Sequence, residues 1–328
     1  MAPLTSVRSL ADEYRGKANS TMDRRKRTAL AAAGMSGVLL LSACAGEGEG
    51  LLDDAGGGDD KEVEIALIAW EEAIAVTHMW EAVLEEKGYD VTITEVDVAP
   101  AFEGVAAGEM DLYLDMWLPV THHEFMDEYR GQIETLGAWY DNAVLTLAVP
   151  GYMEDVHAID DLPGRGGELD GTIVGIEPDA GLTRVTEEET MPGYQLDDEF
   201  DLVASSGASM MDELGQAISQ EEPIVVTLWR PHPAYAQHDL KDLEDPQGLM
   251  GDTESLHSVG REGFSEDYPE LTEWLQSWTM DDEELASLEV LTVGPEVADP
   301  EAGARQWLAD NPFFLERTLG EDAEGLEF

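Results

Sequence analysis

The sequence is poor in cysteine and in basic residues. Its 328 residues include a single cysteine, and 17 Lys and Arg stand against 72 Asp and Glu. One cysteine excludes a disulfide bond within the chain, and a formal net charge of -55 disfavours binding to nucleic acid or to an anionic membrane surface. The G-x-S-x-G and H-E-x-x-H patterns of two hydrolase classes are also missing. The hydrophobic fraction of 43% is nevertheless that of a globular protein with a core.

The acidic excess lies almost entirely beyond residue 44. Residues 45–328 contain 10 Lys and Arg and 69 Asp and Glu, a formal net charge of -59. The acids are spread between well-patterned hydrophobic segments rather than gathered in a tail. Such charge opposes a compact state at low salt, whereas a Debye length of about 3 Å in 1 M salt screens it. The composition therefore predicts a halophilic protein.

Residues 1–44 are typical of an export signal, in which Met22 is a second candidate start. The segment MDRRKRTALAAAGMSGVLLLSAC, residues 22–44, has a basic start, an apolar stretch and small residues before Cys44. Its last four residues, LSAC, resemble a bacterial lipobox, in which the cysteine is lipid-modified. The alternative is a short transmembrane anchor with a chance cysteine, but the apolar run is shorter than the ~20 residues that span a bilayer.

A Gly- and acid-rich stretch follows Cys44. Residues 45–61 begin AGEGEGLLDDAGGGDD, a composition that cannot bury a core and predicts a flexible tether. No later segment is long and apolar enough to span a bilayer. We therefore expect an extracytoplasmic, lipid-anchored protein whose body is held near the cell membrane by Cys44.

The body alternates strand and helix patterns. EVEIALIAW (62–70) is typical of a buried strand, the apolar spacing over 71–88 predicts a helix that ends at Gly88, and YDVTITEVDV, PAFEGVAAGEM and DLYLDMWLP continue as strand, helix and strand. This order predicts an α/β fold with mostly parallel sheets flanked by helices.

The alternation repeats later in the chain. Strands are predicted at AVLTLAVPGYM (143–153) and in EEPIVVTLWRPHPAY (221–235), and strand–helix pairs at 171–188 and 200–219. An amphipathic helix is predicted over DPEAGARQWLADNPFFLERTLG. We predict two similar lobes, residues 62–147 with 252–328 and residues 148–251, which the chain joins by crossing twice.

Three tryptophans lie at the ends of predicted strands, where open α/β sheets bind ligands: Trp70, Trp117 and Trp229. One interpretation is that all three are core residues, as we expect for the other five tryptophans. The other is an aromatic box for a quaternary ammonium ion, which has no N–H to donate and is attracted by ring faces, by ~0.5–2 kcal/mol each.

The chain resembles the glycine betaine-binding lipoproteins of ABC importers over nearly all of residues 62–320. The similarity rests on these segments: AWEEAIAVTH, DLYLDMWLPVTHHEF, LAVPGYM, VGIEPDAGL, PIVVTLWRPHP, HDLKDLEDP and SLHSVGREGF. The resemblance implies a two-lobed periplasmic-binding-protein clamshell of type II, without enzymatic activity, cofactor or metal. It also implies a permease and an ATPase as partners, and glycine betaine or a related choline, carnitine or proline betaine as ligand.

The resemblance assigns roles to residues at matching positions. Trp70, Trp117 and Trp229 would form the ammonium cage, and His122 would hold the ligand carboxylate together with the backbone amides of Gly175 and Ile176. The sequence departs from the family after LWRPH, where Pro233 stands at a position that is often aromatic. His232 and Tyr235 are therefore given no ligand role.

Other interpretations of these motifs remain open. His122 and His123 could simply begin a solvated helix, and adjacent histidines are a poor metal site. Glu71 and Glu72 could attract a cation, although one of two adjacent acids is usually solvated. SSGAS (205–209) could mimic a nucleophile turn of a secreted enzyme, and a surface interaction protein without a small ligand is a third class.

Overall fold

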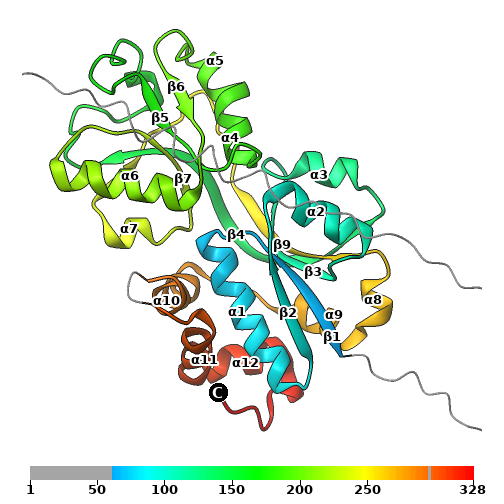
Figure 1. The fold of residues 1–328 in the computed structure, drawn as a ribbon. Coiled ribbons are helices and arrows are strands. Elements are labelled where there is room, and N and C mark those ends of the chain that lie inside the picture. The colour runs from blue at the N-terminus through cyan, green and yellow to red at the C-terminus, as the bar shows by residue number, and fades with distance from the viewer. Residues whose placement is uncertain (1–60, 295–296) are drawn as a thin grey trace, which may run out of the picture. The chain divides into compact units, whose positions relative to one another are not determined.

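The fold is organised around one continuous sheet. A computed structural model describes residues 61–294 and 297–328, and within them nine strands pair in the order β2-β1-β3-β9-β4-β7-β5-β6, with β8 beside β4 (Figure 1). The predicted export signal, Cys44 and the tether up to residue 60 lie outside the described residues. The α/β fold class is thereby confirmed.

The first five elements follow the predicted alternation: β1 (Glu62–Leu67), α1 (Glu71–Glu86), β2 (Asp90–Glu95), α2 (Val98–Ala107) and β3 (Leu112–Leu118). Both β2 and β3 pair with β1 in parallel, because α1 and α2 return the chain to the same end of the sheet. Helix α1 buries Met79 and Val83 against the sheet, and the chain turns after it at Gly88, whose φ is 83°. A short helix, α3 (His123–Glu128), follows β3.

Strand β4 (Ile133–Pro150) is much longer than the strand predicted over 143–153. Its first part pairs with β9 as far as Ala143, and from Val144 it pairs with β7. Register shifts between Thr135 and Ala143, together with Gly137 at a φ of 135°, interrupt the alternation that marks a strand in the sequence. The missed part of β4 is therefore the bulged part.

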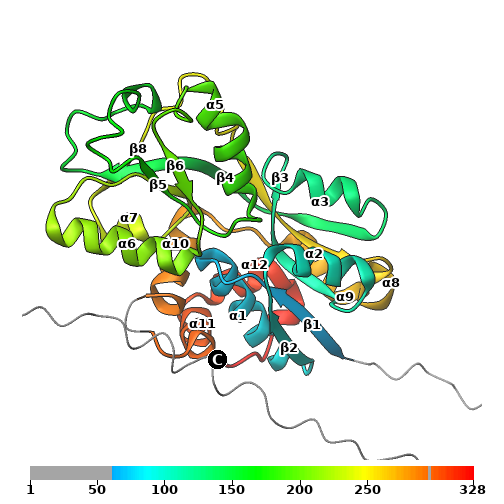
Figure 2. The same cartoon turned by 45° about the horizontal axis from the view of Figure 1, so that its top comes forward.

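The sheet has two halves that meet in β4 (Figures 1 and 2). We call residues 62–143 with 254–323 the first half, and residues 144–242 the second half. The predicted lobe boundaries near residues 147 and 252 stay a prediction, although the pairing of β4 changes partner close to the first of them.

The second half contains short strands and one long helix. Its strands are β5 (Thr172–Val174), β6 (Asp201–Val203), β7 (Val226–Arg230) and β8 (Leu240–Asp242). Its helices are α4 (Gly181–Val185), α5 (Met191–Gly193), α6 (Gly207–Gln220) and α7 (Ala234–Gln237), with a 3-10 turn at Ile159–Asp161 and a π-helical turn at Thr186–Thr190 between α4 and α5. Strand β5 is parallel to β6 and β7, as predicted, whereas β4 is antiparallel to β7 and β8.

The chain then returns to the first half through β9 (Glu254–Arg261), antiparallel to both β3 and β4. It continues through α8 (Phe264–Asp267), α9 (Pro269–Ser277), α10 (Asp282–Thr292), α11 (Pro300–Asp310), α12 (Pro312–Leu319) and a 3-10 turn at Gly320–Ala323. The sheet is therefore mixed: its outer strands are parallel, and the strands that cross between the halves are antiparallel. The single predicted C-terminal helix is two helices, because Pro312 lacks an N–H and disfavours helical backbone at Asn311.

Five tryptophans belong to the core, as predicted: Trp80, Trp139, Trp274, Trp278 and Trp307. Trp139 stacks on Trp278 with ring centroids 4.7 Å apart, and Trp80 meets Trp278 edge-on at 5.5 Å. Helices α10 and α11 pack against α1 and close this side of the first half.

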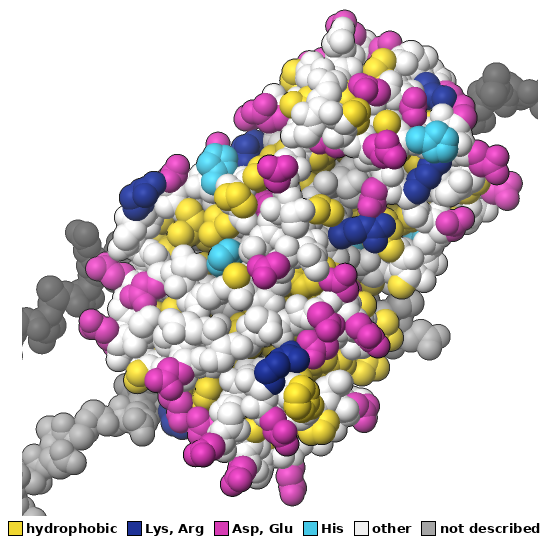
Figure 3. Space-filling model, turned by 180° about the vertical axis from the view of Figure 1, so that it is seen from behind, with side chains coloured by type: hydrophobic (Ala, Val, Ile, Leu, Met, Phe, Trp, Pro, Cys, Tyr) yellow, Lys and Arg dark blue, Asp and Glu magenta, His cyan; other side chains and the backbone are white. Residues whose placement is uncertain are grey.

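Acidic side chains are scattered over the face of the molecule seen in Figure 3 and do not form one patch there. Few Lys and Arg lie between them on this face. Within residues 61–294 and 297–328, no helix has the length and apolar character needed to cross a membrane.

Candidate functional site

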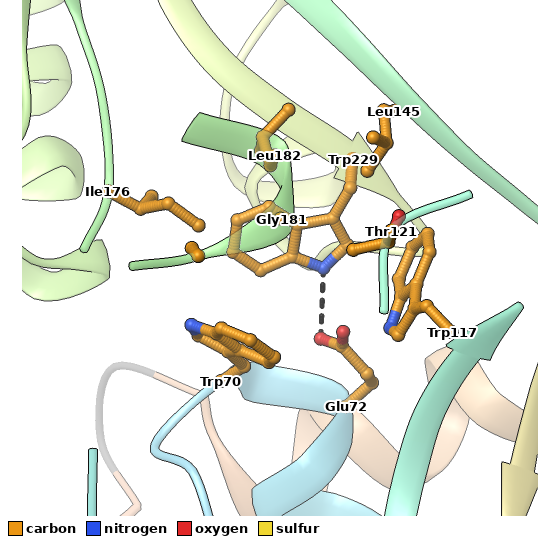
Figure 4. Close-up of a pocket in the computed structure, with 10 residues that line it drawn as sticks. Trp70, Glu72, Trp117, Thr121, Leu145, Ile176, Gly181, Leu182 and Trp229 are labelled. Atoms are coloured by element: carbon orange, nitrogen blue, oxygen red, sulfur yellow. Dashed lines mark hydrogen bonds between the residues drawn. The ribbon is translucent and has the colours of Figure 1, made fainter. Parts of the chain in front are cut away.

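A cavity lies where the two halves meet. About 280 Å³ of space, part of it open to solvent, is enclosed by side chains from both halves (Figure 4). The lining residues are Trp70, Glu72, Trp117, Thr121, Leu145, Ile176, Ala180, Gly181, Leu182 and Trp229. The three predicted strand-end tryptophans are thus brought together, although they are up to 159 positions apart in the sequence.

Each of these tryptophans is placed by the end of an element. Trp70 precedes the first residue of α1, Trp117 is the penultimate residue of β3, and Trp229 is the penultimate residue of β7. All three side chains are at least 95% buried, and their rings border the cavity in Figure 4. We call Trp70, Trp117 and Trp229 the cage.

Every indole N–H of the cage donates to a carboxylate. Trp70 donates to Oε2 of Glu177 at 3.2 Å, and Trp229 donates to Oε2 of Glu72 at 2.9 Å; both bonds join one half to the other. Trp117 donates to Oδ1 of Asp115 at 3.1 Å within the first half. Because the polar edge of each ring is engaged, each indole has a fixed orientation, and its face stays available to a cation.

Glu72 and Asp115 are themselves almost fully buried, with 1% and 0% of their surface exposed. Burial raises the pKa of Glu72 to about 8, against weaker opposing effects of backbone and indole hydrogen bonds. Burial and the neighbouring Glu72 carboxyl also raise the pKa of Asp115 well above its ordinary value. From the sequence, Glu72 was considered only as one of two acids that could attract a cation, and Asp115 was not identified.

His122 lies directly behind the cage and is fully buried. Its ring is stacked on Trp70, with centroids 5.8 Å apart and planes inclined by 7°, and it is not among the residues that line the cavity. The backbone N–H of Trp117 donates to its Nδ1 at 3.0 Å, while its own backbone N–H donates to the carbonyl of Trp117 at 3.1 Å. These two bonds fix the histidine to the residue that carries a cage ring.

The protonation state of His122 follows from the same contacts. Burial, together with the positive charge of Arg184, lowers the pKa of His122 to about 3, so the ring is neutral. Because Nδ1 accepts a hydrogen bond, the remaining proton is on Nε2. This buried N–H has no hydrogen-bond partner among the described residues, which makes it a donor in need of an acceptor.

The two predicted backbone amides differ. Ile176 lines the cavity and its carbonyl accepts from the N–H of Ser205 at 2.8 Å. Gly175 does not line the cavity, and its N–H donates to the carbonyl of Val203 at 2.9 Å. In this arrangement the Gly175 amide is therefore engaged within the sheet, while the side of the cavity is formed by Ile176.

A buried carboxylate that the sequence analysis missed holds the loop after Trp117. Glu254, at the start of β9, accepts hydrogen bonds from the backbone N–H groups of Val120 at 2.7 Å and Thr121 at 2.9 Å, and from the Thr121 hydroxyl. Its side chain is only 2% exposed. The loop that carries His122 is thus fixed by a residue more than 130 positions away, and no local pattern marks that contact.

The halves also touch through a glycine. A Cβ on Gly181 would lie 2.2 Å from the carbonyl oxygen of Thr121, so only glycine permits α4 to approach this loop. Arg184 on the same helix donates to the carbonyl of Val120 at 3.1 Å. Helix α4 and the loop after Trp117 therefore touch each other where Thr121 and Gly181 line the cavity.

The remaining polar residues of the motifs lie at the edge of the site. Nε2 of His232 is 3.2 Å from Oε2 of Glu71, and its ring meets Trp229 edge-on at 4.5 Å. Tyr235 donates to Asp242, and His123 is exposed beside the carbonyl of Val120. Ser206 of SSGAS accepts from the backbone N–H of Ser209 at 3.2 Å and caps α6, which gives that segment a structural role.

Comparison with known proteins gives this geometry a context. The family described as the substrate binding domain of the ABC-type glycine betaine transport system matches residues 61–310. The chain belongs to this family. Proteins of this kind bind the substrate of an importer and are not enzymes, and they work outside the cytoplasm.

Individual relatives agree with the family assignment. A glycine betaine/carnitine transport binding protein, GbuC, of Listeria monocytogenes is 37% identical over 150 residues, which are 45% of this chain and 48% of that protein. The chain thus matches about half of that relative's length. The structure of lactococcal OpuAC, closed on glycine betaine, is 31% identical with a TM-score of 0.73 and covers 79% of this chain and 100% of its own. An ABC-transporter choline binding protein with bound choline is 26% identical with a TM-score of 0.73, over 80% and 92% of the two chains.

Proposed function

We propose that this protein captures glycine betaine, or a closely related quaternary ammonium compound, for an ABC importer. The observation that carries the proposal is the cage, three indole rings with fixed N–H groups around one cavity. A trimethylammonium group has a diffuse charge and a methyl surface, and several ring faces attract it more strongly in a desolvated site than in water. Glu72 in the cavity wall adds a carboxyl group on the same side.

We assign the ligand carboxylate to His122 and Ile176. The Nε2–H of His122 is buried without a partner, and a neutral histidine can donate to a carboxylate without a change of protonation. The backbone N–H of Ile176 is the second donor that we propose. Gly175 would contribute its amide only if its N–H were shared between the ligand and the carbonyl of Val203. Its main proposed role is steric, since a Cβ at this position would lie 3.0 Å from Leu202.

We further propose that the two halves act as lobes that close on the ligand, with boundaries near residues 147 and 252. The closed protein would dock on a permease driven by an ATPase. Cys44 would carry the lipid that keeps the protein at the outer face of the cell membrane. Ligand would shift the population toward the closed form because it contacts both halves only there.

The direct test is isothermal titration of the purified chain with glycine betaine and then choline, in about 2 M KCl to screen the acidic surface. We expect micromolar binding of glycine betaine and far weaker binding of choline, which lacks the carboxylate. Binding of choline alone would retain the cage and remove the carboxylate assignment. Failure of a folded protein to bind either compound would overturn the proposal.

Choline, carnitine and proline betaine are the alternative ligands within the same class. The similarity to a choline-binding structure supports keeping choline in the test. All share a quaternary ammonium group, so the cage alone does not distinguish them. The parts of the ligand that meet His122 and Ile176 decide between them.

A further inference from the structure

Three carboxyl groups are buried beside the cage without a basic partner: Glu72 on α1, Asp115 on β3 and Glu289 on α10. Their side chains are at most 2% exposed. Oδ2 of Asp115 and Oε1 of Glu289 have no hydrogen-bond partner among the described residues, and no salt bridge there joins any of the three to Lys or Arg. Within residues 61–294 and 297–328, no group of three or more His, Cys, Asp or Glu side chains is placed to hold a metal ion.

Buried carboxyl groups without a counter-ion cannot all be ionised. Removing a carboxylate from water is costly unless a positive charge or several hydrogen bonds compensate it. Glu72 and Asp115 each receive an indole N–H, but the charge of Glu72 raises the pKa of Asp115, and the same repulsion must oppose ionisation of Glu72 when Asp115 is charged. The charge of Glu71 also raises the pKa of Glu72. The Glu72–Asp115 pair keeps one proton and titrates as a unit. The raised pKa values of both groups agree with this description.

Of the three acids, Glu72 lines the cavity. Figure 4 shows its carboxyl group between the rings of Trp70, Trp117 and Trp229. A quaternary ammonium group bound against those rings brings a positive charge next to this carboxyl. That charge is permanent, because the nitrogen has no proton to lose. It can therefore compensate the ionised pair in the way that the proton does in the empty cavity.

We propose that a proton and the quaternary ammonium group compete for the Glu72–Asp115 carboxyl pair, so that capture of the cation releases the proton. The O–H bond of the pair breaks, the proton passes to water, and no bond of the ligand changes. This inference rests on the proposed function and deepens it. It makes binding of a compound that does not itself titrate dependent on pH.

The sign of the effect follows from linkage. A cation favours the ionised pair, so acid must weaken binding and alkali must strengthen it, until the empty pair is already ionised. The other titratable groups near the pair do not reverse this. His122 stays neutral between about pH 5.5 and 8.5, because its pKa is lowered to about 3. Tyr113 stays protonated over the same range, because burial raises its pKa well above the ordinary value.

Two further acids and one histidine also face this region. Burial raises the pKa of Glu289 well above its ordinary value, so any proton that it loses adds to the same effect. Burial is the largest influence on Glu71 and opposes its ionisation, but its contact with His232 and a backbone hydrogen bond together lower its pKa, so Glu71 is ionised throughout. The histidine is His232, whose Nε2 lies 3.2 Å from Oε2 of Glu71.

The test measures glycine betaine binding to the full chain in about 2 M KCl between about pH 5.5 and 8.5. We expect affinity to fall at least roughly tenfold toward the acidic end, as loss of up to one proton per ligand requires. Titration in two buffers with different heats of ionisation counts the protons released directly. Circular dichroism at each pH verifies that the protein stays folded.

Two isosteric variants separate this role from a structural one. Glu72→Gln keeps an acceptor for Trp229 but cannot ionise, so binding should be weak and independent of pH. Asp115→Asn keeps an acceptor for Trp117 but removes the neighbouring charge, so Glu72 ionises more easily and the pH midpoint of binding should move to lower pH. Damage to the fold would weaken both variants alike. Glu283→Gln, on the exposed side of α10, makes the same change in net charge and should behave as the unmodified chain.

The outcomes distinguish the two proposals. Loss of binding in acid, proton release, and opposite behaviour of the two variants would support the competition. Binding that is equal across the pH range, with no proton released and normal affinity in Glu72→Gln, would overturn it while leaving the proposed function intact. Absence of glycine betaine and choline binding at every pH would instead remove the proposed function.

Discussion

At the scale of single residues, the candidate site consists of a neutral histidine and three indoles whose N–H groups donate to carboxyl groups, rather than of exposed charges. The ring and the backbone of His122 each form a hydrogen bond with the backbone of Trp117, and burial keeps the ring neutral. An imidazolium in that place would repel the ligand's ammonium group, whereas a neutral N–H can serve its carboxylate. In the proposed complex, the histidine would therefore act on the carboxylate end of the zwitterion only.

His122→Ala is predicted to weaken glycine betaine binding roughly tenfold or more, because a hydrogen bond to a charged group is worth about 1.5–3 kcal/mol. Choline has no carboxylate and should lose much less. Titration calorimetry with both ligands measures the ratio. In Trp117→Ala, a cage ring is lost, so both ligands should weaken together. Equal losses for the two ligands in His122→Ala would contradict the carboxylate assignment.

The residues that the sequence could identify were those with an unusual type or position. Tryptophans at strand ends and adjacent histidines are rare enough to be noticed. The buried acids were not, since 72 Asp and Glu are present and burial depends on which helices pack over them. Glu254 could not be found at all, because its loop partners are set by tertiary structure.

At the scale of elements, the sequence predicted the strands and helices with regular local patterns, but not the full length of the strands that cross between the halves. The strand–helix alternation from β1 to β3 and the strands β5, β6 and β7 lie where apolar patterns predicted them. β4 was predicted too short because its bulges hide the alternation, and β9 was noticed only as part of a family motif. The antiparallel pairing around β4 and β9 was not predicted, because it joins segments that are distant in the sequence.

The approach of α4 to the loop after Trp117 gives a prediction at this scale. Gly181→Ala places a Cβ against the Thr121 carbonyl, an overlap with backbone that only separation of the two segments relieves. Glycine betaine binding should weaken at least roughly tenfold, with little change in melting temperature, because each half can still pack. Calorimetry and a thermal melt measure the two quantities.

Gly215→Ala is the matched control on α6, where an added Cβ meets nothing within 4 Å. It should leave binding unchanged and stabilise the helix by about 0.5–1 kcal/mol. Unaltered binding in Gly181→Ala would show that the two segments need not approach each other in the ligand-bound protein.

At the scale of the whole molecule, the net charge predicts that the stability of the fold depends on ionic strength. Residues 45–328 carry a formal net charge of -59, and the described basic residues are mostly engaged in ion pairs such as Arg305 with Glu85, Glu86 and Glu301. Few cations remain to offset the acids of the surface. We therefore expect the surrounding salt to be the main source of screening for repulsion among the carboxylates.

We predict that the melting temperature rises as KCl is increased from about 0.1 M to 2 M, because the Debye length shrinks from about 10 Å to about 3 Å. Differential scanning calorimetry measures the rise. Sucrose is the comparison, since it favours the compact state without screening charge. Equal stabilisation by sucrose and by KCl would show that charge repulsion is not what salt relieves.

Two indole–carboxylate hydrogen bonds join the halves, so the tryptophans themselves can report the proposed separation of the halves. Trp70 of the first half donates to Glu177 of the second, and Trp229 of the second half donates to Glu72 of the first. Trp117 donates to Asp115 within its own half. If the halves separate as proposed, two indole protons lose their acceptors and the third does not. In a nuclear magnetic resonance spectrum of nitrogen-labelled tryptophan, the first two signals would then report the proposed motion of the halves, and the third would serve as their internal reference.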